Sequence, residues 1–158
     1  MIRTALAAAL LLVATPAAAQ RSAPPLPGDS QAVLGTVEAV YAAIEAKDPK
    51  ALLAVTLLEG SATAAYTSDN GEPMVTSSDW AAYAQRLPHI PGKGKERNLK
   101  AEVQIDGDIA MVWAPYVFTI DGKVVHCGTN HFDLIRKNDE WRVLNATWTQ
   151  RKTGCLAK

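Results

Sequence analysis

The stretch that decides the fold is residues 98–151, NLKAEVQIDGDIAMVWAPYVFTIDGKVVHCGTNHFDLIRKNDEWRVLNATWTQR. Its residues follow a two-residue period, which is typical of strands in a sheet. Asp106-Gly107 and Asp121-Gly122 are strong signals for two-residue hairpin turns, and Asn138-Asp139 is a third candidate. The stretch therefore predicts an antiparallel meander with strands at residues 98–105, 108–120, 123–137 and 140–151.

Two-residue turns also predict the pairing between strands, and hence which side chains share a face. One predicted face holds Met111, Trp113, Pro115, His126, Gly128, Asn130, Phe132, Leu134, Trp141, Val143, Asn145, Thr147 and Thr149. The other holds Val112, Tyr116, Phe118, Cys127, Thr129, His131, Asp133, Leu144 and Trp148. The first face has more large apolar side chains near the last turn, so we expect it to be concave and to receive the helices. A single β-bulge would invert part of this assignment.

The residues before the meander predict three helices and one strand. Asp29 or Ser30 can cap a first helix, whose apolar residues recur at three- and four-residue steps. Asp48 followed by Pro49 predicts a short second helix, because proline fits the first helical turn. The remaining predictions are a strand at residues 62–68, a turn at Asp69-Asn70-Gly71, and a third helix capped by Ser77 or Ser78 that runs through Arg86.

The N-terminus predicts export. Arg3 precedes an apolar run at residues 5–13, Pro16 stops a continuing helix, and Ala17-Ala18-Ala19 matches a signal peptidase site. We therefore predict a signal peptide at residues 1–19, a flexible leader rich in Pro and Ser at 20–29, and one domain at 30–158, in a periplasmic or secreted protein. A transmembrane anchor is disfavoured, since the run is shorter than the roughly 20 residues that span a bilayer.

The composition of the mature chain disfavours two classes of partner. Without residues 1–19 the chain has 139 residues, with 15 basic and 16 acidic side chains. A nearly neutral protein of this kind lacks the positive charge that binds nucleic acid or anionic membranes, so neither partner is expected.

The two cysteines, Cys127 and Cys155, predict a disulfide, because an even count in an exported protein is first interpreted that way. A ring of this size stabilises a fold by about 3.6 kcal/mol. A nucleophilic Cys127 beside His126 is the weaker alternative, since neighbouring strand residues point to opposite faces. His89, His126 and His131 have no familiar metal-ligand spacing, so we expect no metal and no cofactor.

Several local motifs resemble the nuclear transport factor 2-like superfamily, which has the cystatin-like fold. The motifs that carry the resemblance are Trp113-Ala-Pro-Tyr-Val-Phe118, Asp121-Gly122, His126-Cys-Gly-Thr-Asn130-His-Phe132, Asp139-Glu-Trp141 and the terminal Cys155. They are similar to exported bacterial members of the SnoaL-like or lumazine-binding type. The resemblance covers about residues 30–155. It implies an α+β fold in which a strongly curved, mainly antiparallel sheet rolls into a cone against three N-terminal helices.

The same resemblance implies a pocket that members use for binding or for catalysis, but it implies no particular reaction. Steroid isomerase relatives need a carboxylate base, yet the predicted concave face offers Asn130 where a carboxylate would be most useful. We therefore expect a pocket for a small, partly aromatic organic ligand. Its aromatic walls are predicted at Trp113, Tyr41, Tyr66, Trp80 and Tyr83, and its polar contacts at Asn130, Asn145 and His126. The predicted register places Trp113 opposite Asn130, and Asn130 opposite Thr147.

Two alternatives remain open from the sequence. The first is a cofactor-independent acid-base lyase or isomerase, with His126 or the pair His131 and Asp133 as its catalytic groups, although this pair is predicted to face outward. The second is a homodimeric interaction module, because Tyr116, Phe118 and Trp148 would leave the outer sheet face too apolar for water.

Overall fold

The computed structural model describes residues 26–155. The predicted signal peptide and most of the predicted leader lie outside these residues. The helices are α1 (Asp29–Ala46), α2 (Pro49–Ala54) and α3 (Trp80–Arg86), followed by the short 3-10 helix η1 (Leu87–His89). The strands are β1 (Ser61–Thr67), β2 (Pro73–Asp79), β3 (Gly94–Asn98), β4 (Glu102–Asp106), β5 (Ile109–Ile120), β6 (Lys123–Lys137) and β7 (Glu140–Gln150).

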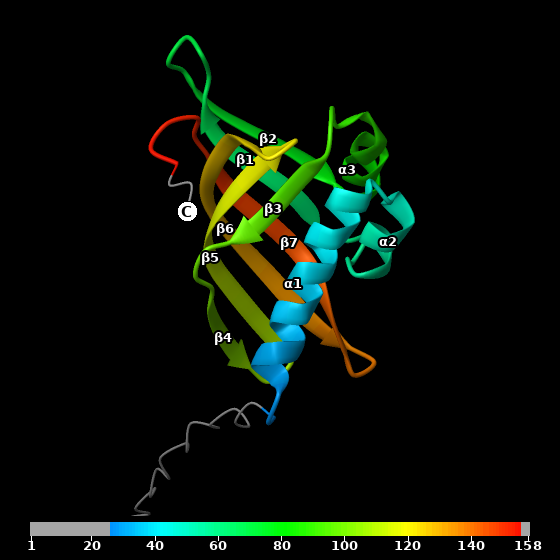
Figure 1. Ribbon diagram of the computed structural model, residues 1–158. Helices are drawn as coiled ribbons and strands as arrows, with labels where there is room; N and C mark the ends of the chain where they lie inside the picture. The colour runs from blue at the N-terminus through cyan, green and yellow to red at the C-terminus, as the bar shows by residue number, and fades with distance from the viewer. Residues whose placement is uncertain (1–25, 156–158) are drawn as a thin grey trace, which may run out of the picture.

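The strands form one seven-stranded sheet in the order β2-β1-β7-β6-β5-β3, with β4 also paired to β5. All neighbours are antiparallel except β1 and β7, which are parallel. The sheet curls around α1, which lies along its concave face, and α2 and α3 close one end (Figure 1). The predicted α+β roll with three helices is confirmed. None of the helices within residues 26–155 is both long enough and apolar enough to cross a membrane.

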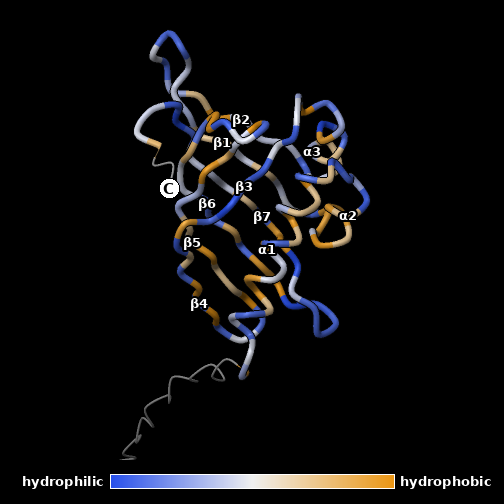
Figure 2. The backbone as a smooth tube through the Cα atoms, in the orientation of Figure 1, coloured by the Kyte–Doolittle hydropathy of each residue, from blue (hydrophilic) through white to orange (hydrophobic). Residues whose placement is uncertain are grey.

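Helix α1 buries one stripe of side chains against the sheet, as its spacing predicts. The buried residues of this stripe are Val33, Val37, Val40, Tyr41, Ala43 and Ile44. The apolar segments of α1, β5 and β6 meet in the interior, while the loops at the ends of the sheet are hydrophilic (Figure 2). At the start of α2 the Asp48 carboxylate accepts hydrogen bonds from the backbone N–H groups of Lys50 and Ala51, with Pro49 in the first turn, which confirms the predicted cap.

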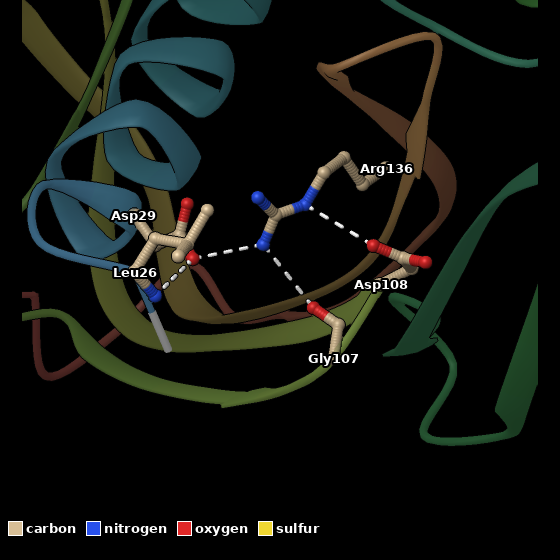
Figure 3. Close-up of polar contacts among 5 residues, drawn as sticks. All are labelled: Leu26, Asp29, Gly107, Asp108 and Arg136. Carbon is tan, nitrogen blue, oxygen red and sulfur yellow. Dashed lines mark hydrogen bonds and ion pairs between the residues drawn. The ribbon is translucent and has the colours of Figure 1, made fainter. Parts of the chain in front are cut away.

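A partly buried ion pair fastens the beginning of α1 to the sheet (Figure 3). Gly28 is the N-cap, and Asp29 stands in the first turn, where its Oδ2 accepts from the backbone N–H of Leu26 and from Nη2 of Arg136, each at 2.8 Å. Burial acts to raise the pKa of Asp29, but these hydrogen bonds and the Arg136 charge outweigh it and lower the pKa. Arg136 also lies over the Trp141 ring, 4.6 Å from its centroid. Asp29 therefore serves as an anchor rather than as the predicted cap.

Two predictions for single segments are wrong. The predicted strand at 98–105 is two strands, β3 and β4, both paired with β5. The predicted third helix starts late, because β2 occupies residues 73–79 and Asp79, rather than Ser77 or Ser78, caps α3 by accepting from Ala82 N–H. Strand β2 lies at the edge of the sheet with almost every residue exposed, so it has no buried face and no alternating pattern by which the sequence could identify it.

Two β-bulges correct the predicted faces. The predicted register holds next to the β5–β6 turn and next to the β6–β7 turn. It shifts by one residue at Phe118/Thr119 between β5 and β6, and again at Asp133/Leu134 between β6 and β7. Each shift turns the following residues over, because strand side chains alternate between faces. The buried residues on the concave face of β5 are therefore Ala110, Val112, Ala114, Tyr116 and Phe118, while Met111, Trp113 and Pro115 face outward. In β7 the residues Ala146 and Trp148 face inward in place of Asn145, Thr147 and Thr149.

The same inversion removes the basis for the predicted dimer face. Tyr116 and Phe118 are only 1% and 8% exposed, and Trp148 packs against the core. These three side chains therefore do not make the outer face apolar. The homodimer stays a prediction, but an apolar outer face made by these residues no longer supports it.

The predicted disulfide between Cys127 and Cys155 is confirmed, with the two Cα atoms 5.5 Å apart. It fastens the residues that follow β7 to β6, beside the backbone pairing of Cys127 with Arg151. The alternative of a nucleophilic Cys127 is wrong, because its sulfur is in the disulfide.

Candidate functional site

A cavity of about 350 Å³ lies between α1, α3 and the concave face of the sheet. Most of its walls are aliphatic or aromatic, and its polar side chains are few. The lining residues are Val40, Tyr41, Ile44, Ala62, Trp80, Tyr83, Ile90, Pro91, Glu96, Phe118, Ile120, Val125, His126, Asn130, Phe132, Ala146, Trp148 and Gln150. The arrangement is typical of sites that hold small organic molecules, in which apolar walls surround a few oriented polar groups.

Aromatic side chains are fixed in the wall by edge-to-face contacts and by one hydrogen bond. Trp80, Tyr83 and Trp148 pack in series, with ring centroids 5.9 and 6.1 Å apart. The indole N–H of Trp80 donates to the carbonyl oxygen of Leu144 at 2.7 Å, at the bulge of β7. The bulge therefore exposes a backbone acceptor that holds the Trp80 ring in place.

Among the described residues that line this cavity, Glu96 supplies the only carboxylate. It stands on β3 opposite Phe118 of β5, and its Oε1 accepts a hydrogen bond from Nδ2 of Asn130 at 2.6 Å. Burial raises the pKa of Glu96 to about 7, although the hydrogen bond from Asn130 acts in the opposite direction. No Lys, Arg or His within residues 26–155 forms an ion pair with Glu96. Near neutral pH the carboxyl group can therefore either donate or accept a proton.

Asn130 links Glu96 to helix α1. Its Nδ2 donates to Glu96 and also, at 3.0 Å, to the hydroxyl oxygen of Tyr41, which in turn donates to Oδ1 of Asn98 at 2.7 Å. Both amide hydrogens of Asn130 are thus engaged, so its orientation follows from the network. Burial, reinforced by the nearby Glu96 charge, raises the pKa of Tyr41, so the phenol stays neutral. The other carboxyl oxygen of Glu96, Oε2, has no hydrogen-bond partner within the described part of the chain.

His126 is a second titratable side chain in the cavity wall. Its ring stacks on Phe118 with centroids 4.8 Å apart, and its Nδ1 lies 3.1 Å from the Tyr116 hydroxyl. Since that hydroxyl donates to the Thr149 carbonyl at 3.0 Å, Nδ1 must be the donor toward Tyr116, which leaves Nε2 of the neutral ring as an acceptor. Burial lowers the pKa of His126, so the neutral ring predominates at pH 7.

Of the residues predicted to contact a ligand, the structure brings Asn130, His126, Trp80, Tyr41 and Tyr83 together around the cavity. Tyr66 lies outside it, in a neighbouring hollow at the end of β1. The predictions that Trp113 and Asn145 face the cavity are wrong. Trp113 precedes the bulge in the β5–β6 pairing, and Asn145 follows the bulge in the β6–β7 pairing, so both side chains lie on the outer face. There Trp113 is 49% exposed, and Asn145 donates to Asp133.

The pair His131 and Asp133 lies on the outer face, as predicted. Nε2 of His131 is 3.4 Å from Oδ1 of Asp133, and the Trp113 ring packs beside His131 with centroids 5.9 Å apart. Both side chains are partly exposed, and neither lines the cavity, so they cannot act on a molecule bound there.

Glu96 is the residue that the sequence predictions missed. Most of its strand, residues 94–97, is rich in charged residues, and the sequence pattern predicts no strand there. The signal that could have identified it is the alternation along β3, in which Lys95 and Arg97 are exposed while Glu96 and Asn98 are partly buried. No group of three or more His, Cys, Asp or Glu side chains that could hold a metal ion occurs in residues 26–155.

No family model and no curated protein matches the sequence. Solved structures share the fold at low identity. A nuclear transport factor 2-like protein of unknown function from Shewanella baltica is 11% identical, with a TM-score of 0.59 over 82% of this chain and 98% of its own. A proposed dehydratase of the same family from Streptomyces avermitilis is 18% identical, with a TM-score of 0.62 over 84% and 100%.

A third similar structure is the β subunit of a proposed aromatic-ring-hydroxylating dioxygenase from Novosphingobium aromaticivorans. It is 14% identical, with a TM-score of 0.65 over 83% of this chain and 94% of its own. The chain therefore has the nuclear transport factor 2-like fold, as the sequence motifs imply. These similarities show the fold alone, because proteins with this fold perform unrelated functions.

Proposed function

We propose that this protein is exported and binds a small, partly aromatic organic molecule in the cavity, with one polar group of that molecule held by Glu96. The observation that carries the proposal is a carboxyl group, hydrogen-bonded by Asn130 and with one oxygen unengaged by the described residues, in a cavity whose other walls are mostly apolar. The disulfide between Cys127 and Cys155 supports an oxidising compartment, and hence a periplasmic or secreted location.

The volume and walls of the cavity favour a flat ligand of one or two rings. A volume of about 350 Å³ falls at the lower end of the range for small-molecule sites. Trp80, Tyr83, Phe118 and Trp148 offer rigid aromatic surfaces on which a ring can pack.

The ionisation of Glu96 determines which polar group the ligand presents. The carboxylate accepts a hydrogen bond from a hydroxyl group, whereas the protonated carboxyl donates one to a carbonyl group. Because the pKa of Glu96 is about 7, both forms occur near neutral pH. An aromatic alcohol and an aromatic ketone of similar size are therefore suitable probes, because the alcohol binds the ionised form of Glu96 and the ketone binds the protonated form.

We expect 2-acetylnaphthalene to bind more tightly below pH 7 and to lose affinity as the pH rises through about 7, since it needs the proton of Glu96. Binding of 2-naphthol should improve over the same range. Each change is expected to be about tenfold in Kd, and calorimetric titration at pH 5.5 and 8.5 measures it. In Asn130→Ala, which removes the hydrogen bond to Glu96, both probes should bind about tenfold more weakly.

Trp113→Ala is the matched control for this experiment, because its ring lies on the outer face and is half exposed. It should bind both probes as the native chain does. Failure of both probes to bind saturably, or equal loss of affinity in Trp113→Ala and Asn130→Ala, would contradict the proposed site.

A second candidate is a cofactor-independent lyase or isomerase that acts by acid-base chemistry. What favours it is the pKa of Glu96 near 7, combined with an imidazole, His126, in the same cavity wall. A general base works best when its pKa is close to the working pH. The proposed dehydratase among the proteins of this fold is consistent with such chemistry.

Proton exchange tests this candidate without knowledge of the natural substrate. In D₂O, Glu96 should remove a methyl proton of 2-acetylnaphthalene and return a deuteron, so NMR should show exchange at least tenfold faster than in buffer. Glu96→Gln should reduce the rate to that of buffer, while His131→Ala, on the outer face, should keep it. A rate that Glu96→Gln leaves unchanged would exclude Glu96 as the base.

A further inference from the structure

The carboxyl group of Glu96 lines the cavity with one oxygen unengaged. Its Oε1 accepts the hydrogen bond from Asn130, whereas Oε2 has no hydrogen-bond partner within residues 26–155. Since Oε2 is not fully enclosed by these residues either, a molecule in the cavity can reach it. This oxygen is therefore an open position for a hydrogen-bond donor of the ligand.

The described part of the cavity wall has no cation that could pair with this carboxylate. Within residues 26–155 the lining includes no Lys and no Arg side chain. Its other titratable groups are Tyr41 on α1, Tyr83 on α3 and His126 on β6. Burial raises the pKa of both phenols and lowers the pKa of His126, so all three are uncharged near neutral pH. An ionised Glu96 is thus the one charge that these residues bring into the cavity.

The negative charge of Glu96 reaches the groups around the cavity. Burial is the larger cause of the raised pKa of Tyr41 and of Tyr83, and the Glu96 charge acts in the same direction on both. A carboxylate that is removed from water needs hydrogen bonds or a positive charge to compensate it. The described chain provides one hydrogen bond, from Asn130, so a ligand that carries a positive charge supplies the missing compensation.

The aromatic walls are compatible with a positive charge. Phe118 is paired with Glu96 across β5 and β3, and Tyr83 packs against Trp148 in the same lining. The faces of aromatic rings carry partial negative charge and attract cations. Tyr83 already shows this preference, because the Arg86 guanidinium lies 5.2 Å from its ring centroid, although Arg86 is not part of the lining. The cavity can therefore accept an aromatic ring that carries a cationic group.

We propose that the ligands of this cavity are arylalkyl amines, whose protonated amino group binds Oε2 of Glu96 while the ring system packs between the aromatic walls. The inference rests on the proposed function and specifies the polar group of the ligand. An alkylammonium group has only donors and, like the lysine side chain, stays protonated at neutral pH. Its hydrogen bond to a carboxylate is charge-assisted, and hence stronger than one made by a hydroxyl or carbonyl group.

The test compares 2-naphthylmethylamine with 2-naphthylmethanol at pH 8 by calorimetric titration, because the two probes have nearly the same shape and differ in charge. The native protein should bind the amine at least tenfold more tightly than the alcohol. In Glu96→Gln this preference should disappear, because an amide cannot neutralise an ammonium group. Glu102→Gln removes an equal charge from an exposed position that is paired with Trp113 on the outer face, and it should keep the preference.

Proton release provides a second readout, which a purely structural role of Glu96 would not produce. Because the pKa of Glu96 is about 7, about half of the native molecules carry its proton at pH 7. Pairing with the ammonium group expels this proton, so about 0.5 proton should be released for each amine bound at pH 7. Titration in phosphate and in Tris, whose ionisation enthalpies differ, measures the release, and Glu96→Gln should release none.

The outcomes separate this inference from the function on which it rests. If the alcohol binds saturably but the amine binds no more tightly and releases no proton, the amine inference is wrong and the cavity proposal stands. The same holds if Glu96→Gln keeps the preference or Glu102→Gln loses it. If neither probe binds, both proposals fall. A Tm of Glu96→Gln at or above the native value shows that a lost preference does not come from loss of the fold.

Discussion

Replacing Glu96 with glutamine should stabilise the fold at pH 8 by about 3 kcal/mol, which raises the Tm by roughly 10 °C. The unfolded chain releases the Glu96 proton near the ordinary pKa of 4.5, whereas the folded chain keeps it up to about pH 7. Between these values the folded state binds more protons, so the stability of the native protein falls as the pH rises. Glutamine remains neutral and can still accept the hydrogen bond from Asn130.

The pH dependence of the difference identifies its cause. The native chain and Glu96→Gln should have the same free energy of unfolding below about pH 4.5, and the difference should grow to its full value above about pH 7. Urea unfolding at pH 4, 5.5 and 8 measures it. Glu102→Gln, on the neighbouring strand β4 with an exposed side chain, is the control and should change stability by less than about 0.5 kcal/mol. A difference that does not vary with pH would show that the carboxyl group is not buried as described.

A stabilising substitution in the cavity would itself support a functional role for Glu96. Nothing in the packing of β3 requires a carboxylate at this position, since glutamine has almost the same shape. Groups that reduce stability are commonly retained where binding or catalysis needs them.

Gly128→Ala should destabilise the fold by about 3 kcal/mol, because a methyl group at this position overlaps the backbone carbonyl of Thr149 on β7. The obstacle is backbone, so rotation of a side chain cannot relieve it. Next to Gly128 the Thr129 N–H donates to the side-chain oxygen of Thr149, and the Thr149 carbonyl accepts from Tyr116. Shifting β7 would therefore also move the Tyr116 hydroxyl that fixes the tautomer of His126.

Gly35→Ala is the matched control for this substitution. Gly35 lies within α1, and nothing stands within 4 Å of the position that its added carbon would take. Alanine should stabilise the helix by roughly 0.5 to 1 kcal/mol. Urea unfolding of both variants gives the comparison, and a Gly128→Ala chain as stable as the native protein would mean that β6 and β7 are not as close as described.

The position of Glu96 in the cavity wall could not be predicted from the sequence, because its neighbours in the sequence are charged. A carboxylate among lysine and arginine residues is typical of an exposed segment, and only the pairing of β3 with β5 places it over Phe118 and against Asn130. Asn130 and His126, by contrast, could be predicted, because they lie on β6 on the strand face set by the turns.

The sequence by itself determined the elements whose signals are local. Turn residues located the hairpins on either side of β6, Asp48-Pro49 located α2, the apolar stripe located α1, and the even pair of cysteines predicted the disulfide. The tertiary structure alone decided which face of β5 and of the far half of β7 is buried. A bulge adds one residue to a strand without any sequence signal that distinguishes it, yet that residue turns over every side chain beyond it. Trp113 and Asn145 therefore lie on the outer face, and Phe118 and Trp148 lie on the inner face. The carboxylate of the cavity comes from β3, a strand that forms by pairing with β5 and that no sequence pattern predicts.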